Sequence, residues 1–174
     1  MTYKNEFKSC LDDLFESLCD VNDWMYENPE LGFQEFKTSK YLVDYIQNYS
    51  KPVNFPSHGL ETAFDVTFGK EGPLSVICVE YDALPEIGHA CGHNIIATAS
   101  IGAGLGLKDI ASKLGIRVKL LGTPAEEGGG GKIVLINEGA FEDASCSMMI
   151  HPGYEDVVNP TFTTIQQYLS LIHI

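Results

Sequence analysis

The sequence predicts an α/β domain in which a central sheet carries helices on both faces. Segments with apolar residues at three- and four-residue spacing alternate with short apolar runs that are rich in β-branched residues. This alternation is typical of strands connected by helices. The chain has 174 residues, of which 44% are hydrophobic and 20% charged. That composition suits one globular domain with a packed core.

The first third of the chain predicts two amphipathic helices. Apolar side chains recur at helical spacing from Phe7 to Met25. Asn28-Pro29 should end this helix, because proline cannot continue a helix and restricts the residue before it. A second helix is predicted from Phe36 to Tyr49, with its apolar residues on one face.

The middle of the chain predicts two strands joined by a turn. Thr62 to Phe68 is the first strand, and Leu74 to Val79 is a continuous apolar run of the kind found in buried strands. The residues between them, 69–73, include two glycines and a proline, which favour a turn. We therefore expect the two strands to form a hairpin.

The remaining elements follow the same alternation. We expect two further helices and two further strands: a helix over 95–111, a strand over 117–121, a helix over 132–138 and a short strand over 147–150. The apolar stretch from Ile95 to Leu107 is too short to cross a bilayer and predicts a buried helix.

Charge and cysteine content exclude several classes of protein. The formal net charge is −13, which argues against binding nucleic acid phosphates. An acidic surface attracts cationic substrates, although it more often serves solubility. The five cysteines are scattered, and acidic residues precede any apolar run at the N-terminus. These features predict a cytoplasmic protein without a signal peptide, a membrane anchor or a disulfide framework.

Residues able to carry chemistry follow three of the predicted strands. Glu80-Tyr81-Asp82 and the segment 88–94 come after the second strand, Glu126-Glu127 after the third, and His151 after the last. In open α/β sheets, ligand sites gather at the carboxyl ends of the strands. The three segments are therefore expected to converge on one pocket.

The residue types in these segments suit a divalent metal. Thiolate, imidazole and carboxylate are the ligands that zinc accepts, and manganese can substitute. Cys91 and His93 lie two apart in a glycine-containing loop, and Glu127 and His151 would arrive from neighbouring strands. Asp82 is placed to orient a histidine ligand. Taken singly, each residue has a structural explanation, such as a buried thiol in the core or a carboxylate in a turn.

The adjacent pair Glu126-Glu127 is the sharpest of these signals. Two neighbouring carboxylates at the end of an apolar strand repel each other unless a cation lies beside them. In a hydrolase, one of them binds the metal and the other takes a proton from the attacking water. The alternatives are an exposed acidic loop and a closed structural zinc site with four protein ligands and no adjacent base.

A nucleotide-binding loop is the rival interpretation of the glycine-rich segment 127–132. The phosphate-loop pattern requires glycine where this chain has Glu126, and serine or threonine where it has Ile133. A second glycine-rich stretch, 102–106, lies inside a predicted helix rather than between a strand and a helix. Neither segment fits a phosphate-binding loop, and the glycines are expected to let the backbone pass close to the metal site.

Taken together, the motifs resemble the aminoacylase/carboxypeptidase family of zinc metallopeptidases, in its amidohydrolase branch. The resemblance covers roughly residues 20 to 160. It rests on Asn28-Pro29-Glu30-Leu31-Gly32-Phe33, Glu80-Tyr81-Asp82-Ala83-Leu84-Pro85, Gly88-His89-Ala90-Cys91-Gly92-His93-Asn94, Gly122-Thr123-Pro124-Ala125-Glu126-Glu127 and His151-Pro152.

The resemblance implies a three-layer catalytic domain like that of zinc exopeptidases, with two zinc or manganese ions bridged by water. It implies a metal-ligand role for Cys91, His93, Glu127 and His151. It implies that Glu126 is the general base and that Asp82 is an acid that supports a histidine ligand. The expected reaction is hydrolysis of an amide bond in small dipeptides or N-acyl amino acids.

Within the branch, the segment 122–132 is most similar to animal dipeptidases that act on β-alanyl-type dipeptides with a basic second residue. Aminobenzoyl-glutamate and auxin-conjugate hydrolases are the alternatives. A catalytically dead, metal-binding regulatory protein is the alternative from another class.

Two parts of the family pattern are missing from this chain: the lid domain, through which the full-length protein is expected to form a homodimer, and a distal histidine ligand, for which His173 is no replacement. We therefore expect residues 1–160 to be the N-terminal part of the catalytic domain. Residues 161–174 are expected to begin the lid connection or to be a non-native tail, and the fragment alone is expected to be inactive.

Overall fold

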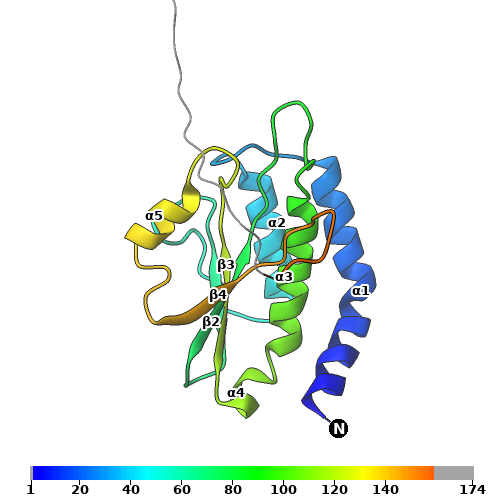
Figure 1. The fold of residues 1–174 in the computed structure, drawn as a ribbon, viewed down its shortest axis with the longest axis vertical. Helices are drawn as coiled ribbons and strands as arrows, with labels where there is room; N and C mark the ends of the chain where they lie inside the picture. Colours follow the sequence, from blue (N-terminus) through cyan, green and yellow to red (C-terminus); the bar gives the residue numbers. More distant parts are fainter. Residues whose placement is uncertain (1, 159–174) are drawn as a thin grey trace, which may run out of the picture.

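A computed structural model describes residues 2–158, and within that range the chain forms a four-stranded sheet between helices (Figure 1). The elements in chain order are α1 (Tyr3–Glu27), α2 (Phe36–Gln47), β1 (Asp65–Phe68), β2 (Leu74–Val79), α3 (His93–Leu107), α4 (Ala111–Leu114), β3 (Arg117–Gly122), α5 (Gly131–Asn137) and β4 (Ala144–Met148). The expectations for residues 161–174, including His173, lie outside the described residues.

The sheet has the strand order β1-β3-β2-β4. β3 pairs with β2 in parallel and with β1 in antiparallel orientation, and β4 pairs in parallel with the other side of β2. The hairpin predicted for β1 and β2 is therefore wrong, because β3 lies between them. β2 is buried along nearly its whole length, and a buried strand needs hydrogen-bond partners on both edges.

The core is divided into two layers by the sheet, as an α/β architecture requires. Ile77 and Val79 point into a cluster shared with α1, α2 and α3, while Val76 and Cys78 point into a second cluster shared with α5. Figure 1 shows α5 on one side of the sheet and the three longer helices on the other. The prediction of helices on both faces is confirmed.

Element boundaries differ from the sequence prediction at several ends: β1 begins at Asp65 rather than Thr62, and α2 ends at Gln47 rather than Tyr49. α3 begins at His93, two residues earlier than expected, and ends at Leu107, after which α4 is a separate short helix. β4 begins at Ala144 rather than residue 147, and Ile150 lies beyond its end. Among the described residues, no helix combines the length and apolar character needed to cross a membrane.

Glycines let α3 pack tightly between α1 and the sheet. A Cβ at Gly104 would lie 2.5 Å from Cγ of Leu120 on β3, and one at Gly106 would lie 2.7 Å from the ring of Phe7 on α1. These glycines belong to the stretch that was considered as a phosphate loop. Their position inside a buried helix agrees with the rejection of a phosphate loop, but Gly104 and Gly106 pack against Leu120 and Phe7 rather than beside the metal site.

The close contact of α3 with β3 predicts the effect of Gly104→Ala. Alanine improves helix propensity by about 1 kcal/mol, but its Cβ would overlap Leu120, and overpacking costs about 1–3 kcal/mol. We expect a lower midpoint of urea unfolding. Gly128→Ala is the control, because a Cβ at Gly128 meets nothing within 4 Å. An unchanged or higher midpoint for Gly104→Ala would show that the two elements are less tightly packed than described.

Candidate metal centre

The three chemistry-bearing segments meet at one edge of the sheet. β2, β3 and β4 run parallel, so their carboxyl ends lie together. Glu80 and Asp82 directly follow β2, Glu126 and Glu127 follow β3, and His151 follows β4. The convergence predicted from the sequence is therefore present in the structure.

His93 stands at the centre of this edge. It is the first residue of α3 and is 1% exposed. Its Nε2 atom lies 3.4 Å from a carboxylate oxygen of Glu80, 3.6 Å from one of Glu127 and 3.7 Å from one of Glu126. One imidazole nitrogen thus faces three acidic side chains.

Asp82 fixes the orientation of that imidazole. The Nδ1 atom of His93 lies 2.8 Å from the backbone carbonyl oxygen of Asp82 and 3.2 Å from its Oδ1 atom. With Nδ1–H donating to these oxygens, Nε2 is the nitrogen left to accept a proton or a cation. The predicted role of Asp82 behind a histidine has this geometry.

The second oxygen of Asp82 holds the neighbouring turn, since it accepts the backbone N–H of Glu127 at 2.9 Å. Burial opposes ionisation of Asp82, but the hydrogen bonds from His93 and from the backbone of Glu127 and Glu126 outweigh it and lower its pKa. Burial likewise opposes protonation of His93, yet the surrounding acids raise its pKa. The site therefore attracts positive charge.

Among the described residues, the buried side-chain atoms without a hydrogen-bond partner include Nε2 of His93, Oε2 of Glu80 and Oε1 of Glu127, and also both ring nitrogens of His89 in the neighbouring loop. Buried polar atoms without partners are costly. Each of the two acidic atoms faces Nε2 of His93, and each belongs to a different group of possible ligands, so divalent cations bound at this edge would satisfy these atoms. The residues present fit a metal ion.

Two overlapping groups of side chains have ligand atoms within 4.8 Å of one another: Glu80, His93 and His151, and His93, Glu126 and Glu127. Four of the residues predicted from the sequence are brought together here, namely His93, Glu126, Glu127 and His151. His151 is exposed, and its Nδ1 atom donates to the carbonyl oxygen of Pro152 at 2.8 Å. That contact leaves its Nε2 atom free to accept.

Cys91 lies beside these groups rather than within them. The neighbouring carboxylate of Glu127, burial and the surrounding acidic charge raise the pKa of the Cys91 thiol to about 11. The thiol therefore keeps its proton unless a cation replaces it. Cys91 and His151 line the same hollow, of about 480 Å³, so the structure brings these two predicted residues to one part of the molecule.

The two glutamates of the pair differ in their surroundings. The side chain of Glu127 is 21% exposed and its backbone is tied to Asp82, whereas the side chain of Glu126 is 42% exposed. Burial and the charge of Glu80 raise the pKa of Glu126. Glu127, with its fixed backbone and an oxygen that has no hydrogen-bond partner, suits the role of a metal ligand. Glu126, which is more exposed and has a raised pKa, suits the role of a proton acceptor.

Sequence reasoning missed Glu80 and Lys132. Glu80 is 1% exposed, and one of its oxygens pairs with Lys132 of α5 while the other faces His93. A signal for Glu80 exists in the sequence, since it lies two residues before Asp82 in an extended segment, where alternate side chains share a side. Lys132 carries no such signal, because it is 52 residues away from its partner.

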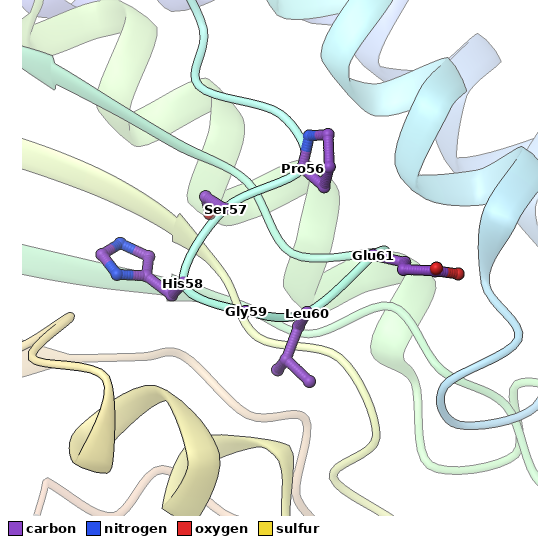
Figure 2. A pocket seen from close by; sticks show the side chains of 6 residues that line it. All are labelled: Pro56, Ser57, His58, Gly59, Leu60 and Glu61. Carbon is purple, nitrogen blue, oxygen red and sulfur yellow. The ribbon is translucent and has the colours of Figure 1, made fainter.

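A second hollow, of about 170 Å³, lies at the turn formed by residues 56–61. Figure 2 shows the side chains of His58 and Glu61 pointing to opposite sides of this turn. His58 instead contacts Asp65, with Nε2 and Oδ1 3.2 Å apart. None of the predicted site residues lines this hollow, so the chemistry belongs to the strand ends.

Comparison with known proteins agrees with the family resemblance. The chain is 38% identical to the Xaa-Arg dipeptidase of Mus musculus over 161 residues, which are 84% of this chain and 37% of that protein. It is 30% identical to a p-aminobenzoyl-glutamate hydrolase chain of Escherichia coli over 165 residues, with coverages of 82% and 34%. The chain thus spans little more than a third of these relatives. No family model matches it.

Solved structures share the fold. A dinuclear metal-binding peptidase of the M20 family from Bacillus subtilis superposes with a TM-score of 0.70 at 24% identity, covering 78% of this chain and 42% of that one. An aminobenzoyl-glutamate utilization protein from Klebsiella pneumoniae gives a TM-score of 0.69 at 22% identity, with coverages of 85% and 46%.

The fold and the sequence relatives lead to one conclusion: the chain is homologous to dipeptidases and amidohydrolases, and it shares the fold of a peptidase of the M20 family.

Proposed function

We propose that the protein is a metal-dependent amidohydrolase that cleaves the amide bond of small dipeptides or N-acyl amino acids. The observation that carries this proposal is the position of His93 Nε2, oriented by Asp82 and facing Glu80, Glu126 and Glu127. A closed structural zinc site would not leave an acid such as Glu126, 42% exposed, beside its ligands.

The proposed ligands are Cys91, His93, Glu127 and His151, with Glu80 as a further acid that sequence reasoning did not assign. Two divalent ions, zinc or manganese, suit this mixture of thiol, imidazole and carboxylate. Charge favours two ions over one, because Glu80, Asp82, Glu126 and Glu127 gather at this edge, and within residues 2–158 Lys132, paired with Glu80, is the one lysine or arginine that forms an ion pair with any of them. A relative in fold is described as dinuclear.

When bound, the metal supplies Lewis acidity that polarises the amide carbonyl and acidifies the attacking water. In this proposal Glu126 accepts the proton from that water and later donates it to the leaving amine. Asp82 keeps Nε2 of His93 aimed at the metal and holds the backbone of Glu127. Lys132 neutralises one oxygen of Glu80 and keeps the other directed at the centre.

We propose a dipeptide with a basic C-terminal residue as the first substrate to test, because the mouse and human relatives are Xaa-Arg dipeptidases. Aminobenzoyl-glutamate is the second, because a bacterial relative is named for it. The acidic net charge of −13 favours the basic substrate in the encounter step.

Removal of metal should abolish hydrolysis. We expect the complete protein to cleave β-alanyl-lysine or an Xaa-Arg dipeptide, to lose this activity on dialysis against a chelator, and to regain it with Zn²⁺ or Mn²⁺. Amine release is the measurement, with acyl amino acids and aminobenzoyl-glutamate as comparison substrates. Metal-loaded protein that cleaves none of them would favour a non-enzymatic, metal-binding role.

Matched substitutions of Glu126 and Glu127 should have different effects on metal content and on kcat. Glu126→Gln should retain the metal while kcat falls by about a hundredfold to ten-thousandfold, because a general base is lost. Glu127→Gln should lose metal. Glu138→Gln, an exposed acid at the end of α5, is the charge control. Elemental analysis and kcat are the measurements, and metal loss from Glu126→Gln would reassign that residue as a ligand.

Glu80 should contribute to metal affinity. Glu80→Gln removes the charge that faces His93, and we expect about tenfold to hundredfold weaker binding of at least one ion, the size seen when acids around metal ligands are changed. Competition with a chromophoric chelator measures this, with Glu138→Gln again as the control. Unchanged affinity and stoichiometry would limit Glu80 to pairing with Lys132.

A further inference from the structure

The motif at residues 28–33 has no role in the chemistry described above. This segment joins α1 to α2 and contacts the chain next to the metal centre. The backbone carbonyl oxygen of Glu30 accepts the N–H of Ala83 at 2.8 Å, and Leu31 forms an isolated parallel bridge with the same residue. The segment is thus attached to the chain that leaves β2 just after Asp82.

Two further contacts, made by the side chain of Glu30 and by Gly32, fix the segment in place. The carboxylate of Glu30 accepts the backbone N–H of Thr38 at 2.7 Å and its hydroxyl at 2.9 Å, which anchors the first turn of α2. Gly32 lies against Ala125, since a Cβ at Gly32 would be 3.0 Å from both Cα and Cβ of Ala125. The segment therefore packs directly on the turn that carries Glu126 and Glu127.

Glu35, at the start of α2, reaches the same turn. It is fully buried, and its Oε1 atom accepts the backbone N–H of Ala125 at 2.8 Å. Its Oε2 atom accepts the hydroxyl of Thr62 at 2.9 Å. Burial raises the pKa of Glu35 in spite of these hydrogen bonds. Placing a carboxylate here is costly, and its partners are a threonine and this backbone amide.

The backbone of Ala125 is unusual. Its φ is +56°, a left-handed conformation that residues other than glycine rarely adopt and that persists when the surroundings enforce it. The residue immediately after Ala125 is Glu126. The direction in which the chain leaves Ala125 decides where both glutamates point.

We propose that Glu35 is a positioning residue: by pinning the amide of Ala125 it holds the left-handed turn that aims Glu126 and Glu127 at His93. The inference deepens the proposed hydrolase function and rests on it for the effect on turnover. Its effect on metal binding, through Glu127, is independent of the substrate.

The test compares substitutions at Glu35 in the complete protein. Glu35→Gln keeps an acceptor for Ala125 and should preserve metal affinity and kcat. Glu35→Met removes the acceptor at similar volume, and we expect kcat to fall by about a hundredfold, the effect of misplacing a catalytic group by about 1 Å, with KM little changed. Its metal affinity should fall as well.

Two variants separate positioning from simple destabilisation. Thr62→Val removes the other hydrogen bond to Glu35 and should lower the unfolding midpoint while leaving kcat of the folded protein nearly intact. Ala125→Gly, added to Glu35→Met, should restore a large part of kcat, because glycine adopts a positive φ without strain. Glu35→Asp, which keeps the charge but shortens the reach, serves if Glu35→Met does not fold.

The outcomes distinguish the two proposals. If the wild-type protein binds metal but cleaves no substrate, the hydrolase function is contradicted. The positioning role of Glu35 is then tested by metal affinity alone. Glu35→Met or Glu35→Asp with wild-type metal affinity and kcat contradicts the positioning role. A Glu35→Met variant whose kcat loss is not reduced by Ala125→Gly contradicts it too, since Glu35 would then act through something other than the turn.

Discussion

The carboxylate of Asp82 is the interaction on which the rest of the site depends. One oxygen, together with the backbone carbonyl oxygen, faces Nδ1 of His93, and the other oxygen accepts the N–H of Glu127. The end of β2, the start of α3 and the turn after β3 are thereby joined by one buried side chain. Because Asp82 is 1% exposed, water cannot replace either contact, and the relative positions of His93 and Glu127 follow from it.

The same arrangement concentrates negative charge where the sheet ends. Acids that share a buried edge repel one another, and the hydrogen bonds around Asp82 together with the ammonium of Lys132 offset only part of that repulsion. A cation would remove the remainder, so metal binding and the folded geometry of this edge should stabilise each other. The same excess of negative charge contributes to the raised pKa of the Cys91 thiol.

The fold was predictable where local pattern and tertiary environment agree. The continuous apolar run of β2 and the period of α1 are strong signals, and both elements lie where expected. The predicted hairpin was wrong because a turn with glycines indicates only that the chain reverses direction. It does not indicate which strand lies next to β2, and in the structure β3 is the parallel neighbour of β2. β4 was misplaced because its small, mostly exposed residues carry little apolar signal, whereas the three residues after Ser147 do.

The site was predictable to the extent that its residues adjoin strand ends in the sequence. His93, Glu126, Glu127 and His151 were found in that way, and their convergence follows from parallel strands. Glu35 could not be found by such reasoning, because its partner Ala125 is 90 residues away and a backbone amide leaves no mark on the sequence. Ligands must carry particular atoms, so residue types reveal them. The groups that hold a turn in a strained conformation need only an acceptor at the right distance, and their identification requires the three-dimensional contact.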